Sequence, residues 1–306
     1  MSSPSVRRTA WSASATALLS LLCASATAEP SQTSASHAVA GKSDSDTVTI
    51  EARRQRKLIE EQISKFVSSI TMPSREESLA RWQAPICPLV AGLPSDSGEF
   101  ILARLSEVAR NARAPLAPPK CQPNFLVVLT TDPELLLRKW WARDPVLFNR
   151  SRGIGGAKRF IHSDRPIRVW YNANAACDDR ALNIYDVGGM TYPSCVNGGL
   201  ASRLTWETVR AIESAIVVAD LRRVNKLNMG QLADYIAMVG LAEIREGAEP
   251  PRVPTILHLF ADTGTAQPLG LSAWDQSFLR ALYSTQQTSA MQLTEIKLRL
   301  GQDLLP

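Results

Sequence analysis

Residues 231–243 read QLADYIAMVGLAE, and this stretch sets the expectations for the rest of the chain. Apolar side chains recur in it at helical spacing, which predicts an amphipathic helix from Gln231 to Val239. Gly240 follows at the position where a glycine commonly ends a helix. Asp234 and Glu243 are acidic residues within this largely apolar stretch, and they are the catalytic candidates of the sequence.

The spacing of this stretch matches the zinc-binding helix of metzincin-type proteases, which reads H-E-x-x-H-x-x-G-x-x-H. With Gly240 aligned on the glycine of that pattern, Ala233 and Ala237 stand at the two helical ligand positions. Asp234 then stands at the general-base position and Glu243 at the third ligand position. An alanine side chain has no atom that binds zinc. The sequence therefore predicts no metal site and no cofactor here, and an ordinary helix that ends at a glycine explains the same residues.

Three segments resemble an uncharacterised family of proteobacterial secreted proteins: the strand over 215–220, the helix just described, and 270–283, which reads GLSAWDQSFLRALY. Related groups of putative lipoproteins carry a helix that is similar to a zincin active-site helix but mostly lack the histidines. The resemblance covers the last third of the chain strongly and the preceding hundred residues loosely. It implies a zincin-like part over about residues 120–300, with no established activity and no catalytic residue to carry over.

The N-terminus has the three parts of a secretory signal peptide. Arg7 and Arg8 are its positive region, residues 10–23 are apolar or small, and Ala26-Thr27-Ala28 offers the small residues of a cleavage site. We therefore expect residues 1–28 to be removed, which lowers the formal net charge from +5 to +3, and the protein to be periplasmic or secreted. No later stretch is long and apolar enough to span a membrane, so none is expected in the mature chain.

Four cysteines follow the predicted cleavage site, and in an oxidising compartment an even number favours two disulfides. Three pairings are possible, and we favour Cys87 with Cys121 and Cys177 with Cys195. A zinc site is not expected because no two of these cysteines have C-x-x-C spacing.

The sequence pattern of residues 47–306 predicts one α+β domain, with a small mixed sheet packed against several helices. Residues 29–46 are rich in Ser, Ala and Thr, which predicts a disordered linker. Within the domain, the patterns predict four strands (47–51, 124–130, 167–171 and 211–221), a Gly-rich loop over 152–156, an irregular insertion over 172–202, and helices over 53–69, from Ser97, after Asp132, and over 273–283 and 291–300.

These features favour a non-catalytic exported binding protein with a degenerate metalloprotease-like fold, whose ligand is a peptide, a glycan or an envelope protein. One alternative is an envelope hydrolase in which Asp234 and Glu243 act as acid and base on a glycosidic bond. Another is a structural or assembly role in which Trp140 and Trp141 contribute to an interface. A nucleic-acid partner is not expected, because basic and aromatic residues are not interleaved.

Overall fold

The computed structural model describes residues 43–71, 79–148, 153–177, 182–187, 190–195, 208–261, 266–285 and 291–305. The chain divides into two units, Met1–Asp46 and Thr47–Pro306, and the second is described below. The predicted signal peptide and most of the predicted linker lie outside the described residues. Among the described helices, none is long and apolar enough to cross a membrane.

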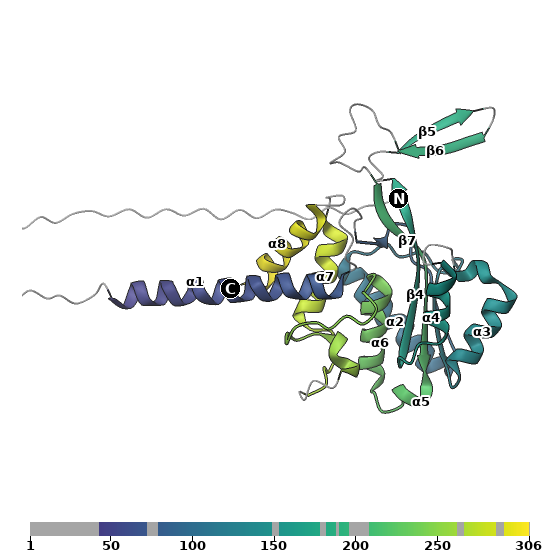
Figure 1. Ribbon diagram of the computed structural model, residues 1–306, viewed down its shortest axis with the longest axis horizontal. Helices are drawn as coiled ribbons and strands as arrows, with labels where there is room; N and C mark the ends of the chain where they lie inside the picture. Colours follow the sequence, from purple (N-terminus) through teal and green to yellow (C-terminus); the bar gives the residue numbers. More distant parts are fainter. Residues whose placement is uncertain are drawn as a thin grey trace, which may run out of the picture. The chain divides into compact units, whose positions relative to one another are not determined.

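A five-stranded mixed sheet forms the centre of the second unit (Figure 1). Strands β2 (Pro88–Ala91), β3 (Phe125–Thr130) and β7 (Thr208–Asp220) run parallel in that order. Strand β1 (Arg81–Trp82) pairs in parallel with the N-terminal half of β7, and β4 (Ile167–Cys177) is antiparallel to β7 on the opposite side. The prediction of an α+β protein with a mixed sheet is therefore confirmed.

Side chains of β7 alternate between two hydrophobic layers, as the pleat of a strand requires. Val217 packs into the larger layer and Val218 into the smaller one, and both are fully buried. Helices cover both faces of the sheet, with α2 and α6 on one and α3 and α4 on the other (Figure 1). Their bounds, with those of the remaining helices, are α1 Ser43–Ile70, α2 Ser95–Ala112, α3 Pro133–Arg143, η1 Pro145–Phe148, α4 Gly153–Ile161, α5 Leu221–Val224, α6 Met229–Leu241, η3 Ile256–Phe260, α7 Ala273–Ser284 and α8 Gln292–Leu304.

Two N-terminal predictions are wrong, because helix α1 begins at Ser43. It includes residues 47–51, for which a strand was expected, and the end of the expected disordered linker. An isolated strand has no partner for its backbone groups, whereas a longer helix satisfies them locally. The apolar stripe predicted for this helix is confirmed, since Ile63, Phe66 and Val67 are buried.

The predicted Gly-rich loop and the predicted irregular insertion also contain regular structure. Helix α4 begins at Gly153, within the loop. Strand β4 continues to Cys177 because the N-terminal half of β7 offers it a partner, with a bulge between Asn172 and Ala173. Beyond it, β5 (Leu182–Val187) and β6 (Met190–Cys195) form a separate antiparallel pair.

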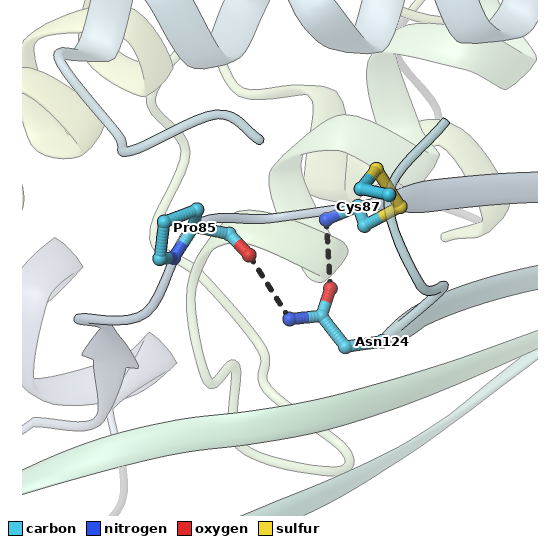
Figure 2. Close-up of a disulfide and its surroundings, with 4 residues drawn as sticks. Pro85, Cys87 and Asn124 are labelled. Carbon is cyan, nitrogen blue, oxygen red and sulfur yellow. Dashed lines mark hydrogen bonds between the residues drawn. A yellow bond between two sulfur atoms is a disulfide. The ribbon is translucent and has the colours of Figure 1, made fainter. Parts of the chain in front are cut away.

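The disulfide predicted between Cys87 and Cys121 is confirmed, with the two Cα atoms 5.9 Å apart. Figure 2 shows how Asn124, just before β3, extends this link. Its side chain accepts a hydrogen bond from the Cys87 amide (2.7 Å) and donates one to the Pro85 carbonyl (3.1 Å). Bond and side chain together fix the starts of two neighbouring strands. The side chains of Cys177 and Cys195 lie outside the described residues, so that pair stays a prediction.

Candidate functional site

Helix α6 contains two of the three positions that the metzincin pattern assigns to zinc ligands. The helix begins with a capping box between Asn228 and Gln231. Ala233 and Ala237 are both fully buried in the main hydrophobic layer. Gly240 does not end the helix as predicted, because α6 continues through Leu241. This face of the helix therefore packs into the protein core.

The first catalytic candidate, Asp234, is held by an arginine of helix α2. The Nε and Nη2 atoms of Arg104 donate to its two carboxylate oxygens at 2.5 and 3.1 Å. The backbone amide of Leu271 donates to the same carboxylate at 2.8 Å. The hydrogen bond to Asp234 raises the pKa of the Arg104 guanidinium, which therefore remains charged. Asp234 thus joins α2, α6 and the segment before α7.

The second candidate, Glu243, lies beyond the opposite end of the helix. It is buried and binds Arg210 of β7 through two hydrogen bonds, at 2.7 and 3.3 Å. Along the helix axis, roughly 10 Å separates Asp234 from Leu241, the last residue of α6. The two carboxylates therefore bind different arginines, and each carboxylate is engaged in an ion pair. This arrangement suits a structural role for both.

Asp234→Ala is expected to lower the free energy of unfolding by about 1–2 kcal/mol, because it leaves Arg104 and the Leu271 amide without their acceptor. The value is below that of a fully buried ion pair because the Arg104 side chain is 32% exposed and solvated. Urea denaturation measures the change. Glu107→Ala removes the other, exposed carboxylate on Arg104 and is expected to change stability little. Equal losses in the two variants would contradict the structural role.

The two histidines of the domain contact residues that are not part of α6. His162 contacts Glu134 (3.0 Å), and the His258 ring contacts the Pro250 carbonyl (3.2 Å). Over the part of the chain with described side chains, no three His, Cys, Asp or Glu residues gather as metal ligands.

A different site lies at β4, the strand at one border of the sheet. In an antiparallel pair, residues alternate between those whose backbone groups bond to the partner strand and those whose groups point away. The amide of Asp220 donates to the carbonyl of Pro166 (2.9 Å), and the register then directs the backbone of Arg168 toward β7 as well. Ile167 and Val169 consequently direct their N–H and C=O groups to the outer edge. Within the described ranges, no hydrogen bond is made by these outward groups.

A groove follows this outer edge, and we call it the β4 edge groove. Its floor is formed by residues 167–171 of β4. One wall comes from α4 and includes Arg159 and Phe160, and the other comes from α6 and the segment after it, with Tyr235 and Arg245. Because α4 and α6 cover opposite faces of the sheet (Figure 1), a groove lined by both lies at its border.

The charge of the β4 edge groove is strongly positive. Four arginines line it, and Glu246 is the only acidic residue in the lining; the arginines are Arg159, Arg165, Arg168 and Arg245. Apart from Arg168, the guanidinium groups of these arginines make no hydrogen bond or ion pair within the described part of the chain. Arg168 also lies near Glu134, Asp164 and Asp220. The excess positive charge of the groove therefore comes from its other three arginines.

Arg168 is the arginine on the floor of the groove. Its Nη1 atom donates to the Ile161 carbonyl (2.6 Å). Its Nε atom is buried and has no hydrogen-bond partner among the described residues. Burial lowers the pKa of the Arg168 guanidinium below its ordinary value, with charged neighbours as smaller influences. A buried donor without an acceptor costs about 1–3 kcal/mol.

Sequence reasoning did not find this groove. The strand over 167–171 was predicted, but its place at the border of the sheet depends on pairing with β7, about forty residues later. The arginines stand on three separate segments, so no local motif joins them. No protein-family model, no curated protein and no solved structure matches the chain, and the zincin-like resemblance stays a prediction.

Proposed function

We propose that this protein is a non-catalytic binding protein outside the cytoplasm, and that it binds an extended polypeptide segment along the β4 edge groove. The observation that carries the proposal is the outward backbone of Ile167 and Val169 in a groove with side-chain walls. An added strand gains main-chain hydrogen bonds from such an edge, and the walls select its side chains.

The groove suits a polypeptide better than a compact small molecule. Along an edge strand, every second residue directs its N–H and C=O groups outward, so these groups recur about every 6.8 Å. An extended peptide has the same spacing between alternate residues. Phe160 and Tyr235 belong to opposite walls, so side chains on both faces of an added strand would meet a wall. Burial raises the pKa of Tyr235 to about 12, so its hydroxyl stays protonated well into the alkaline range.

The confirmed disulfide supports a location outside the cytoplasm, because disulfides persist in oxidising compartments. In such a protein, Asp234 and Glu243 stabilise the fold through their ion pairs. A binding role then requires no catalytic group, and the edge groove replaces helix α6 as the functional surface.

Val169→Pro is expected to reduce peptide binding at least tenfold, because proline removes the outward N–H group. Proline is tolerated on an edge strand when the missing N–H faces away from the sheet. The probes are three N-acetylated, amidated heptapeptides of the form Val-X-X-Val-X-X-Val, in which X is Glu, Gln or Lys. Isothermal titration calorimetry measures their affinity, and amide hydrogen exchange measures protection of the β4 backbone.

The matched control is Val169→Ala, which keeps the N–H group and is expected to bind nearly as well as the unchanged protein. Circular dichroism and thermal melting establish that both variants are folded. If no peptide of the three protects the amide of Val169 from exchange, strand addition at β4 is wrong.

A further inference from the structure

The two walls of the β4 edge groove both carry unpaired positive charge. Arg159 lies on α4, and Arg245 follows α6, so the two belong to opposite walls. Arg165 approaches the second wall, since its Nη2 atom would lie 3.1 Å from a Cβ at Gly247. A strand added to β4 directs alternate side chains to alternate faces of the sheet. Neighbouring residues of a bound segment would therefore meet arginines on both sides.

We propose, on the premise of the proposed function, that the segment bound by the β4 edge groove is acidic, with carboxylates directed at both walls. Three arginines, Arg159, Arg165 and Arg245, against Glu246 in the lining give the groove its complementarity to such a segment. Carboxylates pair with guanidinium groups through two parallel hydrogen bonds, which Gln or Ser cannot match in charge.

A second copy of this chain is a poor occupant of the same edge. Pairing two β4 edges would bring two sets of arginines together, and like charges placed directly across a strand pair are destabilising. Charged side chains beside an edge strand are also a common protection against such self-association. The arginines thus act against a copy of the chain and in favour of an acidic partner.

The charge of the peptide provides the test. The Glu heptapeptide is expected to bind at least tenfold more tightly than the Gln heptapeptide at low ionic strength, and the Lys heptapeptide more weakly than either. The preference for Glu is expected to shrink as salt is added, because charges near the surface are screened over about 8–10 Å. In Arg165→Gln/Arg245→Gln, the affinity for the Glu peptide is expected to fall to that for the Gln peptide.

The matched control is Arg56→Gln/Arg110→Gln, which removes the same charge from helices α1 and α2, away from the groove. This control is expected to keep the tenfold preference for Glu. If the Glu and Gln peptides bind equally and both protect Val169 from exchange, the proposed acidity is overturned while strand addition stands. If no peptide binds, the proposed function itself fails.

Discussion

Replacing Gly240 with alanine is expected to lower the free energy of unfolding by about 3 kcal/mol, although alanine is the better helix former. An added Cβ would lie 2.0 Å from the Cζ atom of Phe125, far inside van der Waals contact. The ring cannot move away easily, because it is fully buried and packs against Trp82 with ring centroids 5.9 Å apart. Trp82 is itself fixed, since its Nε1 atom donates to the Gly240 carbonyl (2.8 Å).

Gly301→Ala is the matched control for this substitution. Gly301 lies inside helix α8, and the nearest atom to an added Cβ is the end of the Leu305 side chain at 3.7 Å. This variant is expected to gain up to about 1 kcal/mol from helix propensity alone. Thermal and urea denaturation of both variants measure the contrast. A Gly240→Ala protein as stable as the unchanged one would show that α6 does not approach β3 as closely as described.

Gly240 also shows where sequence reasoning about α6 went wrong. A glycine after an apolar helical stripe resembles a C-terminal cap, and the metzincin pattern assigns its glycine to a turn. In the structure, Gly240 is needed because the helix packs closely against Phe125 of β3, which leaves no room for a side chain. Such a requirement arises between elements that are about 115 residues apart in the chain, so no local pattern reveals it.

The sequence predicted most helices and strands that begin and end at local signals, such as a capping residue. Ser272 and Asp132 cap α7 and α3 as expected, and the apolar strands over 124–130 and within 211–221 are confirmed. Failures occur where a partner decides the structure. Strand β4 is longer than predicted because β7 pairs with it. The β4 edge groove exists only because no strand covers the outer side of β4 in the described chain.

The candidate carboxylates illustrate the same limit. The sequence singles out Asp234 and Glu243 as acidic residues in an apolar segment, and both are buried, Asp234 within α6 and Glu243 just beyond it. It gives no sign of their partners, because Arg104 and Arg210 come from other elements. Once the partners are known, a structural role explains why both carboxylates are buried.

Asp275→Ala is expected to lower the free energy of unfolding by about 3–4 kcal/mol, because one fully buried carboxylate serves several donors. It accepts hydrogen bonds from the Thr255 hydroxyl (2.5 Å), the Ile256 amide (2.8 Å) and the Ser272 amide (2.9 Å). The substitution leaves these donors unsatisfied between η3 and the start of α7. Urea denaturation, with the slope checked for two-state behaviour, measures the loss.

The isosteric variant Asp275→Asn separates hydrogen bonding from charge. It keeps one acceptor oxygen and is expected to lose less stability than Asp275→Ala. Burial raises the pKa of the Asp275 carboxyl, and hydrogen bonds from Thr255 and Ser272 only partly oppose this rise. A raised folded-state pKa means that this group stabilises the fold most below its unfolded pKa of about 3.9, and that this contribution is lost as the pH increases through the folded value. Asp275→Asn does not titrate, so the difference in stability between it and the unchanged protein is expected to shift in favour of Asn as the pH rises. A difference that stays constant with pH would show that hydrogen bonds offset the cost of burying this carboxylate.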